Sequence, residues 1–290
     1  MPAKNFYLFR PTPVTYFVLM KKSRYSSGLL SAALILLSGC AVYVPTVPST
    51  PLLRGKGEVE LMAALRGVSS LEASAAWSPV PQLLVTGEAA LQTSTGGETR
   101  NNVTTNYSNV HRQGGLGLGT YRMLGVDKQT YLAAIGGVGF ASASVYDNHI
   151  DGFYLFIPLF GPLVHYEATY QRYYGQVYIA QQGPLWSYGL SARATFVNYS
   201  TLLRNDVSIE PPSRFFLEPT LFVRVGRRAF QGQATFGLST PLSRGDRQNP
   251  DITNLAPIST LISVGVVIRP HFFQHRDEVP DTPYYKQGMN

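Results

Sequence analysis

From Gly57 to Arg269 the chain repeats one pattern, in which about ten residues of alternating polarity are followed by a turn. Successive side chains of a β-strand point to opposite faces, so alternation of apolar and polar residues indicates a strand with two unlike faces. The alternation is clearest in six segments, at residues 58–66, 71–77, 83–92, 186–196, 230–239 and 258–269. Four segments with weaker alternation, rich in Gly, Tyr and Phe, lie between them at 113–123, 129–145, 166–180 and 214–226. No segment sustains a period of 3.6, and the pattern predicts an all-β domain of about ten strands.

Each strand has an apolar face and a polar face. Val59 and Leu61 share the apolar face of the first segment, and Val264 and Val266 share that of the last. The opposite faces carry carboxylates and guanidinium groups in similar number, which suggests ion pairing on one side of the sheet. The predicted charge network consists of Glu58, Glu60, Arg66, Glu72, Glu88, Arg193, Glu218 and Arg224.

The connections alternate in length. Short turns are expected at 79–82, 125–128, 182–185 and 226–228, and long polar or Pro/Gly-rich loops at 93–111, 146–165, 200–213 and 241–257. The first connection, at 67–69, is short although it is expected at the same end as the long loops. An up-and-down order of strands therefore gathers the long loops at one end.

Face polarity separates a soluble barrel from a membrane barrel. A soluble barrel packs apolar side chains inside, whereas a membrane barrel turns them toward lipid and keeps polar groups inside. After residue 40 the chain has only the lysines Lys56, Lys128 and Lys286, fewer than a charged, water-facing surface usually has. Seven aromatic residues fall near strand ends, as in the interfacial belts of membrane proteins: Trp77, Tyr121, Tyr131, Trp186, Tyr188, Phe215 and Phe230. These features favour a membrane barrel whose lumen holds the charge network, although a soluble barrel stays open.

The pattern over residues 57–269 resembles small outer-membrane β-barrel proteins of Gram-negative bacteria. The resemblance implies an up-and-down antiparallel transmembrane β-barrel with short periplasmic turns and long outer loops. A barrel of about ten strands is expected to have a lumen filled by side chains rather than a porin channel. One departure is the polar tail at 270–290, because many such barrels end on an aromatic residue; Phe272 and Phe273 are candidate substitutes.

The first 39 residues have the order of a secretory signal. A basic stretch from Met20 to Arg24 precedes an apolar run from Gly28 to Leu37 that is too short to span a membrane as a helix. Met20 is then the expected initiator. The removed stretch carries five of the 24 basic residues and none of the 17 acidic ones, so the mature net charge is +2 rather than +7. The basic pI therefore gives no reason to expect nucleic-acid binding.

Leu37, Ser38, Gly39 and Cys40, which holds the single thiol of the chain, resemble the lipobox of bacterial lipoproteins. The resemblance implies peptidase recognition at the three residues before the cysteine, cleavage there, and a diacylglycerol and an N-acyl chain on Cys40. Several acyl chains give stable anchoring. In such families Ala41, in place of Asp, implies sorting to the outer membrane. Residues 40–56 read as an extended, lipidated tether that runs from an anchor in the inner leaflet, and no other cofactor is expected.

Other candidate motifs give little indication of a catalytic or metal site. His271 and His275 have helical metal-ligand spacing, but Pro270 argues against a helix there. Asp147, His149 and Asp151 suggest a rim hydrolase only weakly. The glycines at 114, 115, 117 and 119 are expected to form a strand packed against a bulky neighbour rather than a phosphate loop. The apolar stretch 153–164 is either part of a long strand, a plug or a partner site.

The sequence as a whole predicts a lipid-anchored outer-membrane barrel with a non-enzymatic structural or binding role. Its expected partners are membrane lipids and the machineries that assemble barrels and sort lipoproteins. Two alternatives remain open: a soluble periplasmic lipoprotein barrel that binds an apolar ligand, and an outer-membrane barrel enzyme with rim residues such as His149 and His165.

Overall fold

The computed structural model describes residues 42–274, apart from 101–102, 155–156, 211–212, 228 and 243–257. Strands dominate the described residues. They are β1 (Val59–Arg66), β2 (Ser70–Trp77), β3 (Leu83–Arg100), β4 (Val103–Leu124), β5 (Thr130–Tyr154), β6 (Ile157–Gln182), β7 (Trp186–Arg204), β8 (Val207–Ser208), β9 (Arg214–Arg227), β10 (Phe230–Pro241), β11 (Ser259–Thr260) and β12 (Ser263–Ile268). One helical turn, α3 (His271–Gln274), follows the last strand.

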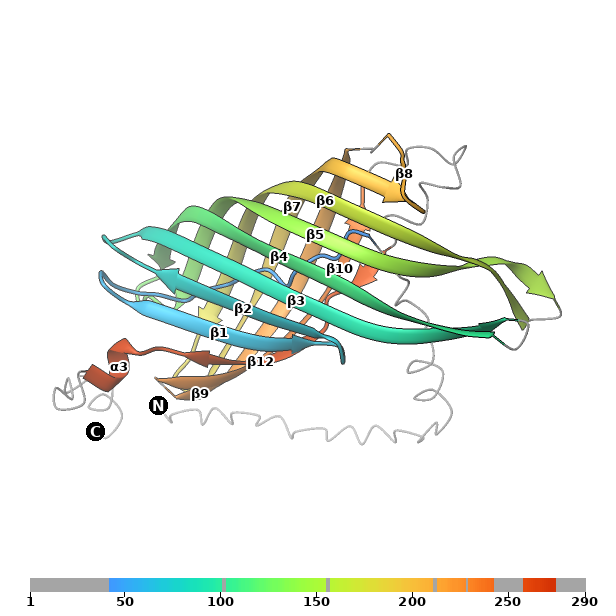
Figure 1. Ribbon diagram of the computed structural model, residues 1–290. Coiled ribbons are helices and arrows are strands. Elements are labelled where there is room, and N and C mark those ends of the chain that lie inside the picture. The colour runs from blue at the N-terminus through green and yellow to red at the C-terminus, as the bar shows by residue number, and fades with distance from the viewer. Residues whose placement is uncertain are drawn as a thin grey trace, which may run out of the picture. The chain divides into compact units, whose positions relative to one another are not determined.

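Ten of these strands close into an antiparallel barrel with up-and-down order (Figure 1). Neighbours in sequence pair with one another from β1 to β7, then β7 pairs with β9, β9 with β10 and β10 with β12. The seam forms between β1 and β12, where Leu61 lies opposite Ile268 and Arg66 opposite Ser263. The predicted fold class and strand number are confirmed, because each of the ten segments coincides with one barrel strand.

Two of the four predicted long loops are strands instead. β3 and β4 pair without interruption from Leu83 to Arg100, and β5 and β6 pair as far as Tyr154 and Ile157. In Figure 1 these two hairpins project beyond the other strands. The alternation of apolar and polar residues is weak in these hairpins, because both faces of a two-stranded projection contact the same solvent. The described parts of the apolar stretch 153–164 accordingly belong to the long strands β5 and β6, which is the simplest of the three interpretations.

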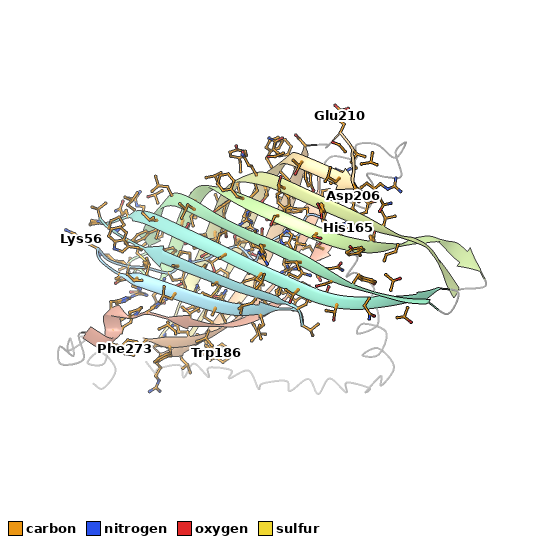
Figure 2. All side chains as sticks on the ribbon, viewed as in Figure 1. Lys56, His165, Trp186, Asp206, Glu210 and Phe273 are labelled. Carbon is orange, nitrogen blue, oxygen red and sulfur yellow. The ribbon has the colours of Figure 1, made fainter. Side chains whose placement is uncertain are left out.

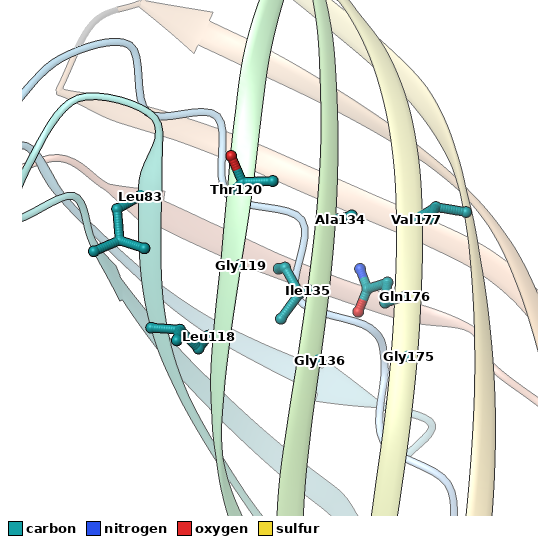
Figure 3. A pocket seen from close by; sticks show the side chains of 10 residues that line it. All are labelled: Leu83, Leu118, Gly119, Thr120, Ala134, Ile135, Gly136, Gly175, Gln176 and Val177. Carbon is teal, nitrogen blue, oxygen red and sulfur yellow. The ribbon is translucent and has the colours of Figure 1, made fainter.

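The apolar faces point away from the barrel axis. Leu61, Val264 and Val266 are 41%, 67% and 48% exposed, whereas the alternate residues of the same strands are buried or half-buried. The outward positions of β1, β2, β10 and β12 hold no charged side chain. Figure 3 shows one stretch of this outer face, where a shallow groove runs between Leu118 and Val177.

Aromatic residues divide between the two faces. Trp77, Trp186 and Phe230 are about half exposed on the outer surface, as predicted for residues near strand ends. Tyr121 and Tyr131 were grouped with them, but both rings lie inside the barrel and stack at 5.3 Å. Their positions in the strands explain why they face inward, because each is an even number of residues from other inward-facing residues of its strand.

Glycines of β4 and β5 make room for two large side chains of β6. A Cβ atom at Gly137 would collide with the ring of Tyr174, and one at Gly139 would collide with the Arg172 side chain. Gly117 faces the Tyr174 hydroxyl in the same way. The glycine-rich strand is thus packed against bulky neighbours, which confirms its interpretation as a strand rather than a phosphate loop.

The one-turn helix α3 corrects the expectation that Pro270 forbids a helix. Proline is tolerated at the start of a helix, where its missing N–H has no intrahelical partner. The Nδ1 atom of His271 lies 3.2 Å from the carbonyl oxygen of Val59, and His275 is outside the described residues. Among the described residues no helix is long and apolar enough to span a membrane.

Candidate functional site in the barrel lumen

An extended segment of the chain itself occupies the lumen. Residues 42–53, which precede β1, have no regular hydrogen-bonded structure and are buried throughout. Figure 1 shows them as a blue trace that runs inside the barrel. We call these residues the lumenal segment. The sequence predicted extended backbone here but not this location.

Its proline spacing explains why the lumenal segment stays extended. Pro45, Pro48 and Pro51 recur at every third position, which matches the three residues per turn of a polyproline II helix. Such a helix makes no internal hydrogen bonds, so a buried one needs partners for its backbone groups elsewhere. Proline also lacks an N–H, which removes three donors that the lumen would otherwise have to satisfy.

Side chains of the barrel wall supply those partners. Two backbone N–H groups donate to carboxylates and five carbonyl groups accept from wall side chains. The N–H of Val47 donates to Glu72 at 2.9 Å, and that of Leu52 to Glu60 at 3.3 Å. The donors to the carbonyl oxygens are Gln113 to Val44 (3.1 Å), Arg193 to Thr46, Gln176 to Ser49 (2.7 Å), Arg224 to Thr50 (2.7 Å) and Tyr178 to Pro51 (2.6 Å). Four of these seven bonds involve an ionised wall group and are therefore of the stronger, charge-assisted kind.

The ionised groups of the wall also pair with one another. Glu218 accepts from Arg193 Nε at 2.5 Å and from the Tyr43 hydroxyl at 2.9 Å. Glu88 lies 2.5 Å from Arg172 and 3.6 Å from Arg193, so the second arginine bridges two carboxylates. Arg193 and Glu218 are both fully buried. Charges this deep require partners, because the desolvation of an unpaired one costs several kcal/mol.

A second cluster lies around Glu60. Its Oε1 atom is 3.0 Å from Arg224 and its Oε2 atom 2.9 Å from Arg269. Arg66 and Glu72 form a further pair at 2.6 Å. Each cluster also bonds to the lumenal segment, so the segment and the network form one continuous polar core.

Apolar contacts hold the two ends of the lumenal segment. Near its start, Tyr43 packs on Phe216 at 4.2 Å between ring centroids and on Tyr170 at 5.9 Å. Near its end, Leu52 and Leu53 are buried in a separate cluster that contains Tyr131 and Tyr178. The lumen is therefore polar in its middle and apolar toward both ends.

The structure brings seven of the eight predicted network residues together inside the barrel. These are Glu60, Arg66, Glu72, Glu88, Arg193, Glu218 and Arg224. Glu58 instead lies outside the network, just before β1, where its carboxylate accepts from the backbone N–H of Arg54 at 2.7 Å. The lipobox residues Leu37, Ser38, Gly39 and Cys40 are outside the described residues.

Sequence reasoning missed several wall residues. Gln113, Gln176 and Tyr178 serve the lumenal segment, and Arg269 completes the cluster around Glu60. The available signal is strand parity, because Gln176 and Tyr178 lie four and six residues after the lumenal Arg172. Alternation in that part of β6 is hard to see because both faces carry tyrosines.

The histidines near the long-loop end do not assemble a catalytic relay in the described residues. His111 is buried in the lumen, with Nε2 2.6 Å from the Tyr170 hydroxyl. His165 Nε2 lies 3.0 Å from Ser144 Oγ, but the nearest Glu167 oxygen, at 3.9 Å, approaches the same nitrogen. A Ser–His–acid relay needs the acid at the opposite ring nitrogen. The side chains of His149 and Asp151 are outside the described residues.

No protein-family model matches the sequence, and no curated protein is significantly similar to it.

Proposed function

We propose that the protein is a lipid-anchored outer-membrane β-barrel with a non-enzymatic structural or binding role in the cell envelope. In this proposal residues 1–39 are removed, Cys40 receives a diacylglycerol and an N-acyl chain, and the barrel crosses the membrane. The lumenal segment closes the lumen, so the protein is not an open pore. Any partner then binds at the projecting hairpins and at the connections on the same end of the barrel.

The observation that carries the proposal is the polarity of the two barrel faces. The outer surface presents Leu, Val, Ile and aromatic side chains around its circumference, while arginines and carboxylates are buried inside. Soluble monomers rarely expose contiguous apolar patches larger than a few hundred Å². A lipid environment makes the same surface favourable, and outer-membrane barrels have this arrangement.

The soluble, ligand-binding alternative needs the opposite interior. A barrel that binds an apolar ligand offers an apolar cavity, whereas the middle of this lumen holds Arg172, Arg193 and Arg224, all at most 1% exposed. The lumenal segment lies among these side chains and is buried throughout. The interior is therefore built to bind its own polypeptide rather than an oily molecule.

Insertion and anchoring are tested separately. The folded barrel should migrate differently on a gel before and after boiling, because closed barrels resist the detergent until heated. Radiolabelled palmitate should be incorporated into the native protein and into Ser38→Ala, a small-for-small change before the cleavage point, but not into Cys40→Ala. Cofractionation of the unboiled protein with soluble periplasmic proteins would refute the membrane assignment, and labelling of Cys40→Ala would refute the anchor.

A further inference from the structure

The direction of the lumenal segment fixes the end of the barrel at which the mature chain starts. Its last residues lie at the short-turn end, where Arg54 Nε donates to Gln182 at 2.6 Å. β6 ends at Gln182, and Gly57 then bonds to Ser78 as β1 begins. Figure 2 places the neighbouring Lys56 at the same end as Phe273.

The first described residues lie at the opposite end. Val42 and Tyr43 pack in a cluster with Val145, Val164 and Leu202, and Ile209 adjoins it. Leu202 is near the end of β7, and Ile209 follows β8 on the long-loop side. Figure 2 places Asp206 and Glu210 at this end, away from Lys56.

The length of the segment matches a membrane crossing. The nine steps from Tyr43 to Leu52 span about 28 Å at the polyproline rise of about 3.1 Å per residue. The apolar band of an outer-membrane barrel is about 25 Å tall. The two ends of the lumenal segment therefore lie near opposite faces of such a band. Cys40 is two residues before Val42 in the sequence. Two residues of chain reach at most about 7 Å, because the chain extends at most about 3.6 Å per residue.

We propose that the mature chain starts at the long-loop end, and that the acyl chains of Cys40 enter the outer leaflet on that side. The inference rests on the proposed function, which supplies the lipid and makes the long-loop end external. It replaces the inner-leaflet anchor that the sequence alone suggested. The lipid and the projecting hairpins then share the external face, and the lumenal segment is the connection between them and β1.

Epitope accessibility on cells tests the topology. A short uncharged epitope is inserted after Ala41, between Asn205 and Asp206, or between Val126 and Asp127, one site in each variant. An antibody to the epitope should stain intact cells for the first two variants, and only permeabilised cells for the third. If the Asp206 epitope is reached on intact cells but the Ala41 epitope is not, the inference is wrong and the proposed function stands. If the Asp206 epitope is itself hidden, the proposed orientation is wrong.

Cross-linking tests the path through the lumen independently of lipidation and of the epitope. In a Cys40→Ala background, Tyr43→Cys is combined with Phe216→Cys, because the native rings at these positions pack with their centroids 4.2 Å apart. A short bismaleimide should join this pair in the folded barrel. It should not join Tyr43→Cys to Leu217→Cys, because Leu217 is 38% exposed on the outer face. Failure of the first pair to cross-link in a heat-modifiable barrel would overturn the inference, whatever the epitopes report.

Discussion

Neutralising one lumenal carboxylate, Glu218→Gln, is the sharpest test of the polar core. The carboxylate is fully buried and accepts four hydrogen bonds, from Arg193 Nε (2.5 Å), Tyr43 (2.9 Å), Thr195 (3.1 Å) and Ser239 (3.1 Å). Glutamine has the same shape but only one acceptor oxygen, and its NH₂ group would face donors. Arg193 would retain only Glu88 as an ionic partner, at 3.6 Å.

The expected loss of stability follows from burial. Removing one partner of a buried ion pair costs about 3–5 kcal/mol, whereas an exposed pair contributes about 0–1 kcal/mol. Glu167→Gln is the matched control, because the Glu167 side chain is 50% exposed and 3.9 Å from His165. Glu218→Gln combined with Arg193→Met removes both charges. We expect this double variant to be less destabilised than the sum of the two single variants, with a coupling of about 0.5–3 kcal/mol.

The measurement is urea unfolding of the barrel folded into lipid vesicles, followed by the fluorescence of Trp77 and Trp186. Both indoles are on the outer face and leave lipid on unfolding in the proposed membrane state. A loss for Glu218→Gln no larger than that for Glu167→Gln would refute the reasoning, since it would mean that the lumen is hydrated well enough to solvate a free guanidinium.

Three further changes probe other parts of the barrel. Gly137→Ala should destabilise the barrel by about 1–3 kcal/mol, because the added Cβ atom would overlap a tyrosine ring. Gly175→Ala should be tolerated, because open space surrounds that position. The temperature at which each variant loses its heat-modifiable gel migration compares the two effects. Val264→Arg should lower the stability of the barrel in vesicles by about 2–4 kcal/mol if residue 264 faces the membrane centre. Val126→Arg, in a fully exposed turn, should have little effect. Equal effects of the two substitutions in urea titrations would contradict a lipid-facing β12. Replacing residues 42–53 by a Gly–Ser chain of equal length should raise the ion conductance of the barrel in planar bilayers, and an unchanged conductance would show that wall side chains alone close the lumen.

Most of the barrel could be predicted because its strands separate two unlike environments. In β1 and β12 every second residue is apolar and outward, so parity alone assigned Leu61 and Val264 to the correct face. Parity also found Glu60, Arg193 and Glu218 for the lumen. The prediction was wrong at Tyr121 and Tyr131, which were assigned from residue type and nearness to strand ends, because tyrosine is compatible with both a lipid interface and a polar interior.

The lumenal segment could not be predicted in the same way. Its sequence, with prolines at 45, 48 and 51, matches a solvated linker as well as a buried one, since a polyproline helix has the same local geometry in both settings. What distinguishes them is the pairing of its backbone groups with residues such as Glu72 and Arg224, which are distant in sequence. Such pairings leave no periodicity in the chain. One indirect signal existed, because a small barrel with several inward arginines needs acceptors beyond its own carboxylates.

The position of the segment also constrains how the barrel can close. The segment precedes β1, and β1 pairs with β12 across more than 190 residues to form the seam. Its wall partners are spread over β2, β6, β7 and β9, so no single hairpin can hold it in place. Once the seam is formed, the segment could enter only lengthwise, past Arg172 and Arg193, which are both fully buried. We therefore expect the contacts of the lumenal segment to form before or together with the β1–β12 pairing.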